Sequence, residues 1–224
     1  LKRPGVTLQL LWQEYRNSAD PDYYYSYASF CRILNTALKG SKGSYHKEYA
    51  PGEVLMIDFA GDKLSYTDKS TAKQIDCVVF VGVLGYSNYT YVKVLPSAKL
   101  PYLIQALNNN LLHIQGVPLF VLTDNMAQLV TRADRYEPTF TSAALSWANH
   151  NGTMLETARI AHPKDKSGVE AHVRIAYQRI YAPLRNQTFY SLKELGAAVS
   201  QKLREHNQKN FQGRTYSRLD QFTQ

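Results

Sequence analysis

The segment QIDCVVFVGVLGYS, residues 74–87, is long and almost wholly apolar, and it limits the choice of fold more than any other feature. A nearly continuous apolar run of this length is typical of a central strand that is buried on both faces of a sheet. Two strand patterns precede it, EVLMIDFAG at 53–61 and the short KLSYTD at 63–68. The alternating segment YTYVKVLPS, residues 89–97, follows it. Strand patterns in such close succession predict an antiparallel meander.

The chain then changes to alternating helices and strands. The segment KLPYLIQALNNNLLHI, residues 99–114, has apolar residues at helical spacing, and GVPLFVLTDN, residues 116–125, has the pattern of a short buried strand. Four more elements are predicted, namely a helix at 141–151, a strand at 154–160, a helix at 170–184 and a helix at 191–206. A meander followed by helix-linked strands predicts an α/β chain with a ribonuclease H-like fold, in which a mixed five-stranded sheet carries helices on both faces.

The first 40 residues form a separate helical pattern. TLQLLWQEYRN at 7–17 and YSYASFCRILNTALKG at 25–40 each place apolar residues on one helix face. Two short helices with a basic, Tyr-rich connection predict a helix-turn-helix segment that binds DNA, but a helical hairpin packed on the main domain explains the pattern nearly as well. The predicted division of the chain is 1–40 (helix-turn-helix), 41–52 (linker), 53–190 (core) and 191–224 (C-terminal helix and tail).

The composition is basic. Lys and Arg total 26 against 18 acids, which gives a net charge of +8 and a pI near 9.3. A protein of this charge often binds a polyanion, most commonly nucleic acid, although a merely basic enzyme is an equal alternative. The two cysteines, Cys31 and Cys77, lie in apolar segments, which predicts reduced thiols rather than a disulfide. No apolar run reaches the roughly 18 residues of a membrane span.

Three carboxylates fall at the ends of predicted elements. Asp58 ends the first strand, Asp124 ends the fourth, and Glu170 begins the helix after the fifth. In a ribonuclease H-like sheet these positions come together, and three carboxylates repel one another unless cations join them. Two Mg²⁺ or Mn²⁺ ions held by Asp and Glu oxygens would also suit attack on a phosphodiester.

Each of these acids could instead have a purely structural role. An Asp after a strand is often a turn residue or a helix N-cap, and Glu170 near a helix start also suits the helix dipole. Acids that compete for a place in the site are Asp62, Asp68, Asp76, Asp134 and Glu156.

Basic residues surround the predicted trio. Lys164 and Lys166 precede Glu170, and Arg174 and Arg179 follow it on the predicted helix. These side chains suit contacts with DNA phosphates, although a solvated helix face is an equal alternative. The further DNA-binding candidates are Arg132, which follows Asp124 along the chain, and Arg32, in the second N-terminal helix.

Several long blocks resemble the IstA-type transposases of bacterial insertion sequences, a DDE transposase family. They include PGEVLMIDFAGDKLSYTD, VFVGVLGYSNYTYVKV and HPKDKSGVEAHVRIAYQR. The resemblance covers nearly the whole chain and implies a retroviral-integrase-like catalytic core at 53–190. Its metal-binding Asp-Asp-Glu triad falls on Asp58, Asp124 and Glu170. Ala171 stands where the family often has Asn, which puts the contacts beside the triad in doubt.

The resemblance also implies partners and a cellular setting. It assigns 1–40 to binding the transposon's terminal inverted repeats and implies attack on target DNA by a homo-oligomer. It further implies an IstB-type AAA+ ATPase helper and a cytoplasmic, nucleoid-associated bacterial protein without a membrane partner. The chain starts at Leu1 in mid-pattern, so we expect a fragment of something longer. The alternatives are a non-catalytic DNA-binding and assembly fragment, or a ribonuclease H-like nuclease acting on RNA–DNA hybrid.

Overall fold

The computed structural model describes residues 7–19, 23–40, 48–61, 63–124, 126–132, 138–157 and 175–224. The contacts within the chain divide it into two units, residues 1–46 and 47–224.

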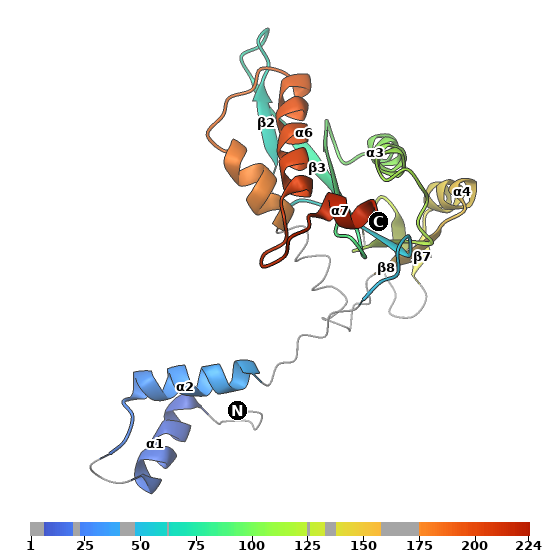
Figure 1. Ribbon diagram of the computed structural model, residues 1–224. Coiled ribbons are helices and arrows are strands. Elements are labelled where there is room, and N and C mark those ends of the chain that lie inside the picture. Colours follow the sequence, from blue (N-terminus) through green and yellow to red (C-terminus); the bar gives the residue numbers. More distant parts are fainter. Residues whose placement is uncertain are drawn as a thin grey trace. The chain divides into compact units, whose positions relative to one another are not determined.

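The N-terminal unit contains two helices where helical spacing predicts them. Helix α1 spans Leu8–Ser18 and helix α2 spans Tyr27–Gly40 (Figure 1). Thr7 caps α1, because its side-chain oxygen accepts a hydrogen bond from the Leu10 amide at 3.1 Å. The cap fixes where the first helix begins.

Aromatic rings hold these two helices together. Tyr15 of α1 stacks on Phe30 of α2 with ring centroids 5.2 Å apart, and Trp12 meets Tyr27 edge-on at 5.6 Å. Helix α1 nevertheless buries none of its residues. A pair of helices with so little enclosed apolar surface has only a small core of its own.

The second unit is built on a six-stranded sheet. Its strands are β1 (Val54–Phe59), β2 (Leu64–Thr67), β3 (Gln74–Leu84), β4 (Thr90–Leu95), β5 (Phe120–Thr123) and β8 (Met154–Thr157). The order is β2-β3-β1-β5-β8, with β4 on the other edge of β3. Strands β1, β3 and β4 are antiparallel, whereas β1, β5 and β8 are parallel.

This sheet has one strand more than the five predicted. The sixth strand is β2, which forms from the short strand pattern at 63–68 and pairs with the first residues of β3, from Gln74 to Cys77. Strand β3 is long enough to hold β2 and β1 one after the other along the same edge. The sheet is therefore mixed, as predicted, and has a short extension along one edge of β3.

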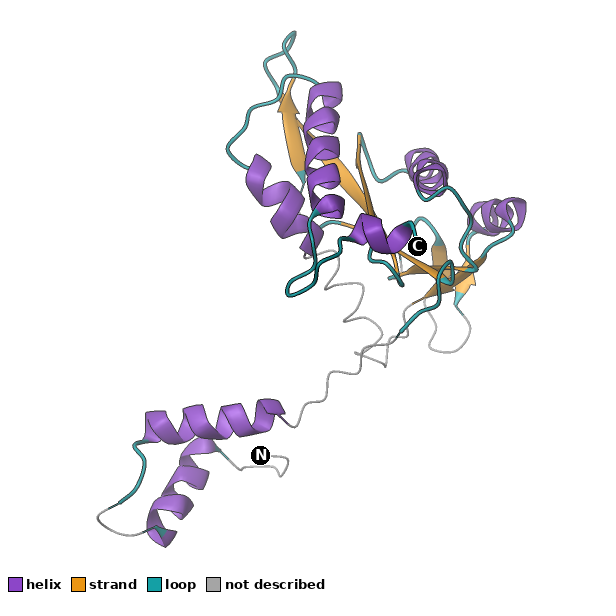
Figure 2. Ribbon diagram, viewed as in Figure 1, coloured by secondary structure: helices purple, strands orange, loops and turns teal. Residues whose placement is uncertain are grey.

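Helices cover both faces of the sheet, as predicted (Figure 2). On one face, α3 (Leu100–His113) and α4 (Ser142–Asn151) pack on a core that includes Leu55, Ile57 and Phe80. On the other, α6 (Leu192–Gln208) and the segment η1 (Tyr177–Tyr181) pack on valines of β3 and β4. The alternation of side chains along β3 supplies both cores at once.

Three elements differ from the sequence prediction. The described part of the predicted helix at 170–184 winds as a π-helix at Tyr177–Tyr181 and a 3₁₀ turn at Ala182–Leu184. A small hairpin of β6 (Val130–Arg132) and β7 (Thr139–Phe140) was not predicted. The predicted polar tail contains a short helix, α7 (Arg218–Phe222), that is opened by a capping box.

Within the described residues, no helix combines the length and apolarity that a membrane crossing would need.

Candidate active site

Two predicted acids come together at the carboxyl end of the parallel strands. Strands β1 and β5 pair in parallel register, and the last registered pair is Ile57 with Thr123. The next residues along the two strands are Asp58 and Asp124. Neighbouring strands lie about 4.8 Å apart, so the sheet brings these two positions side by side.

Both acids point to the same face of the sheet. Met56 pairs with Leu122, and both side chains are buried in a small apolar cluster with Val54. Asp58 and Asp124 lie two residues further along their strands, and side chains two residues apart share a face. The two carboxylates therefore continue this apolar row to the carboxyl end of the strands, where both residues are half-buried.

The pair is a suitable donor set for a hard divalent cation. Adjacent, partly buried carboxylates repel each other, and a cation between them removes that cost. Mg²⁺ and Mn²⁺ favour carboxylate oxygens. The Asp58 Oδ1 atom accepts a hydrogen bond from the Phe59 amide at 2.7 Å, which helps to fix the side chain on the strand.

Among the described residues, no third ligand lies close to the pair. In the described part of the chain, no three His, Cys, Asp or Glu side chains are grouped so that they could hold one metal ion. The predicted third acid, Glu170, lies outside the described residues. Glu156 pairs with Leu122 and shares the face of the two aspartates, but it is exposed and does not complete such a group.

Two competing acids have structural roles of their own. Asp68 accepts hydrogen bonds from Ser70 and Thr71, and these bonds, that from the Ser70 hydroxyl above all, lower the pKa of its carboxyl group. Asp76 forms an exposed ion pair with Lys63 at 3.5 Å. Asp62 and Asp134 lie outside the described residues.

The predicted DNA-binding residues fall into two groups. Arg32 on α2 and Arg132 in β6 are exposed, and Arg179 in η1 is half-buried. Lys164, Lys166 and Arg174 lie outside the described residues. Arg218 of α7 was not predicted as a functional residue, because it lies in the segment that was predicted to be a polar tail.

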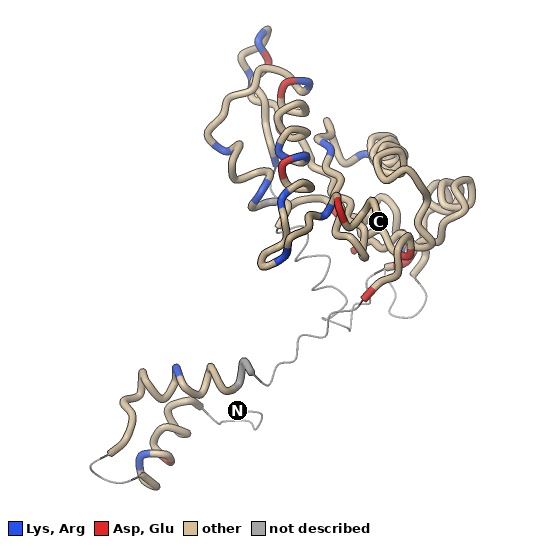
Figure 3. Tube along the Cα trace, viewed as in Figure 1, with Lys and Arg blue, Asp and Glu red and all other residues tan. Residues whose placement is uncertain are grey.

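Charge is unevenly distributed over the two layers of helices (Figure 3). Helices α3 and α4 contain no Asp, Glu, Lys or Arg, whereas α6 and η1 carry several. Asp58 pairs with Val81 of β3, and Val81 packs under α6 and η1. The paired carboxylates thus share a face of the sheet with the charged layer of α6 and η1.

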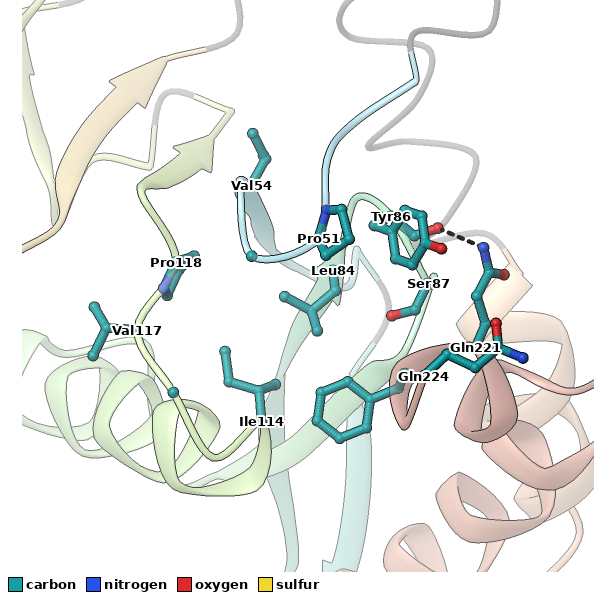
Figure 4. Close-up of a pocket in the computed structure, with 13 residues that line it drawn as sticks. Pro51, Val54, Leu84, Tyr86, Ser87, Ile114, Val117, Pro118, Gln221 and Gln224 are labelled. Carbon is teal, nitrogen blue, oxygen red and sulfur yellow. Dashed lines mark hydrogen bonds between the residues drawn. The ribbon is translucent and has the colours of Figure 1, made fainter.

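A cavity lies away from these carboxylates. A pocket of about 320 Å³ is lined mainly by apolar groups, including Val54, Leu84, Ile114 and Phe222 (Figure 4). Val54 begins β1 and Asp58 lies four residues on, so the pocket is roughly 13 Å along the strand from the carboxylates. It does not contribute to the candidate active site.

Comparison with known sequences gives clear relatives, although no family model matches the chain. A protein named as a transposase of insertion sequence IS408 from Burkholderia multivorans is 37% identical, over 94% of this chain and 41% of its own length. Another, for IS1162 of Pseudomonas fluorescens, is 36% identical over 94% of this chain and 38% of its own length. In sequence, the chain is therefore similar to proteins that are named as insertion-sequence transposases. It spans about two fifths of the length of these relatives.

Solved structures confirm the fold. The catalytic core domain of BIV integrase superimposes with a TM-score of 0.52 at 15% identity, over 77% of this chain and 94% of that one. The HTLV-2 integrase catalytic core, solved with magnesium, gives 0.52 at 16% identity, over 79% and 99%. At such low identity the likeness shows the fold alone. The chain therefore has a fold like that of a retroviral integrase core, as its sequence predicted.

Proposed function

We propose that this chain contains the catalytic core of a DDE-type DNA transposase of the IstA type. In this proposal it carries out metal-dependent phosphodiester cleavage and joins transposon ends to target DNA. The observation that carries the proposal is the placement of Asp58 and Asp124 as neighbours at the carboxyl end of β1 and β5. The kinship with insertion-sequence transposases supports it independently.

Each member of the triad has a separate position in the proposal. Asp58 and Asp124 hold the metal from adjacent strands, and Glu170 completes the site. Two Mg²⁺ or Mn²⁺ ions, when bound, would activate the attacking water or 3′-hydroxyl and stabilise the leaving oxygen. The half-buried position of both aspartates supports this, because a carboxylate there binds a cation with little competition from water.

Basic residues position the DNA in this proposal. Lys164, Lys166 and Arg174 come from the same segment as Glu170 and would hold the strand being cut. Arg132 and Arg179 would contact phosphates further from the reacting group. The exposed Arg132 and the half-buried Arg179 are both accessible to a phosphate backbone.

The N-terminal unit would recognise the terminal inverted repeats. Its two helices fit the helix-turn-helix prediction, and Arg32 is exposed on the second of them. The small core of this unit supports the idea that DNA contributes to its stability, since binding to the folded state alone adds to stability. Such a unit suits a recognition segment that is held by a linker.

Assembly and a helper protein complete the proposal. Transposition joins two ends, so we expect a homo-oligomer on DNA. The uncharged α3 and α4 layer, with Leu112 75% exposed and Leu145 46% exposed, is a suitable surface for a second copy. An IstB-type AAA+ ATPase would select the target, and the substrate would place the protein at the bacterial nucleoid.

A strand-transfer assay tests the proposal. A pre-cleaved transposon end, a plasmid target and Mn²⁺ or Mg²⁺ are mixed with the wild-type chain, Asp124→Asn or Asp76→Asn. We expect joined products from the wild type and from Asp76→Asn, which removes an exposed acid elsewhere in the sheet. Asp124→Asn should lose about a thousandfold or more in rate while still binding the DNA end.

The alternatives give different results in the same experiment. Equal joining by Asp124→Asn and the wild type would contradict the assignment of this acid. Cleavage of RNA–DNA hybrid without any preference for transposon ends would favour a ribonuclease H-like nuclease. End binding without joining, by this chain and by a longer one that contains it, would favour a non-catalytic assembly fragment.

A further inference from the structure

Arg218 has an unusual environment for an arginine. It is the first residue of α7, and only 5% of it is exposed. Arginine is rarely buried to this degree unless an anion accompanies it, because a lone buried charge loses its hydration. Its guanidinium carbon lies 4.6 Å from the centroid of the Phe211 ring, a contact that suits a cation but does not neutralise it.

The same region holds a second arginine in the same condition. Among the described residues, Arg179 and Arg218 each have a buried Nη1 atom without a hydrogen-bond acceptor. Segment η1, which carries Arg179, and α7, which carries Arg218, both pack against α6. Two buried donors without an acceptor therefore lie on elements that pack against the same helix.

The two guanidinium groups also influence each other. Burial, followed by the positive charge of Arg179, lowers the pKa of Arg218 to about 10. Asp220, the acid closest in sequence, does not relieve this. Its Oδ2 atom accepts hydrogen bonds from the Ser217 amide at 2.7 Å and the Ser217 hydroxyl at 2.8 Å. In the described part of the chain, neither arginine forms an ion pair with an acid.

We propose that Arg179 and Arg218 bind one phosphodiester group of DNA, an inference that rests on the proposed function. A phosphodiester has two unesterified oxygens that share one charge, so each guanidinium can donate to its own oxygen. Arg179 is half-buried and opens the site to the surface, while Phe211 supports Arg218 from the side. A bound phosphate would provide the acceptors that both Nη1 atoms lack.

The position of this site indicates what it does. Helix α7 also supplies Gln221 and Phe222 to the pocket at the start of β1, whereas Asp58 lies near the other end of that strand. The phosphate bound here is therefore not the one that reacts. Losing the contact should therefore weaken DNA binding.

The salt dependence of DNA binding by the 224-residue chain tests the site. A short duplex of transposon-end sequence is titrated at several salt concentrations with the wild type, Arg179→Gln and Arg214→Gln. Arg214 is exposed in the loop before α7 and gives the same change of charge. We expect Arg179→Gln to reduce the slope of log K against log salt by about 0.9, the value for one phosphate contact, and Arg214→Gln to change it less. Equal slopes for both variants would overturn the proposal.

Thermal melting gives a second readout that needs no activity. At equal ionic strength, inorganic phosphate should raise the Tm of the wild type and of Arg214→Gln relative to chloride, but not that of Arg179→Gln. Arg218→Lys keeps the charge without the planar fork, so it should fold and lose most of this stabilisation. Stabilisation by polyglutamate that exceeds that by DNA would overturn the proposal in favour of an acidic protein partner.

The two proposals fail separately. A slope change specific to Arg179→Gln, without strand transfer by the wild type or by a longer chain that contains it, would leave the phosphate site in place and contradict the proposed function. Strand transfer by the wild type with no difference between Arg179→Gln and Arg214→Gln would remove the phosphate site alone.

Discussion

The two faces of the central sheet are covered by layers of different character. The layer of α3 and α4 contains no charged residue of the Asp, Glu, Lys or Arg type, and its outer surface exposes Leu112 and Leu145. The layer of α6 and η1 carries several such residues, and the face it covers also carries Asp58. Figures 2 and 3 show the layers and their charges from the same side.

Because the two faces differ, one sheet can contribute to a buried core on one side and to a candidate active site on the other. Alternation sends Phe80 of β3 to the uncharged layer and Val81 to the charged one. On strand β1 the same alternation gives Ile57 to the core and Asp58 to the opposite face. A shift of one residue in the register would exchange the two roles, so the core fixes the carboxylates in place.

The first prediction tests whether both layers contribute alike to stability. Leu107 of α3 is 1% exposed and Leu195 of α6 is 0% exposed, so each fills one of the two cores. Replacing either by Ala should lower the free energy of unfolding by about 2–5 kcal/mol. Leu112→Ala, at a site 75% exposed, should change it by less than about 0.5 kcal/mol. Denaturant unfolding measures all three variants. A loss of stability for only one of Leu107→Ala and Leu195→Ala would show that the two layers do not contribute alike.

The second prediction concerns the tight fit of the uncharged layer. A Cβ atom at Gly82 of β3 would overlap the side-chain amide of Asn110, a buried residue of α3. Gly82→Ala should therefore cost about 1–3 kcal/mol, because the helix or the amide must move. Adding Asn110→Ala should recover much of that loss.

Gly196 of α6 is the matched control for this prediction. A Cβ atom there meets nothing within 4 Å, and Gly in a helix is unfavourable. Gly196→Ala should therefore stabilise the chain by about 0.4–1 kcal/mol. Thermal unfolding of Gly82→Ala and Gly196→Ala tests this prediction. A lower stability in both variants would show that the close fit is not special to α3.

The smallest expected effect is a pH dependence located in the uncharged layer. His113 stacks on Tyr89 with ring centroids 4.8 Å apart, and burial lowers the pKa of its imidazole. A lowered histidine pKa means that the folded state resists protonation. The stability it contributes is therefore complete above the unfolded pKa of about 6.5 and falls as the pH decreases below it.

His113→Gln should remove this part of the acid dependence. His150→Gln, at an exposed site on α4, serves as the control and should leave it unchanged. The free energy of unfolding of the wild type and both variants, measured between about pH 7 and pH 5, tests this prediction. An unchanged slope in His113→Gln would assign the dependence to other groups.

Much of the fold was predictable because its elements are long. The apolar run of β3 and the helical spacing of α3, α4 and α6 each gave the correct type of element. Strands β6 and β7 were missed because two or three residues contain too little alternation to be recognised. The π-helix of η1 departs from the 3.6-residue period on which a helix prediction depends.

The candidate site was predictable only in part. Asp58 and Asp124 stand out as acids at strand ends, but their adjacency depends on the order and register of β1 and β5, which no local pattern contains. Helix α7 left a signal that could have been used, since Ser217 and Asp220 have capping-box spacing. The burial of Arg218 left none, because an isolated arginine in a polar segment is normally exposed.

Metal binding to the paired aspartates tests the proposed active site most directly. Mn²⁺ affinity is measured by electron paramagnetic resonance for the wild type, Asp58→Asn, Asp124→Asn and the control Asp76→Asn. If the two strands jointly hold the metal, each of the first two variants loses at least about tenfold in affinity, and Asp76→Asn binds like the wild type. Unchanged Mn²⁺ binding in both Asp58→Asn and Asp124→Asn would contradict the proposed active site.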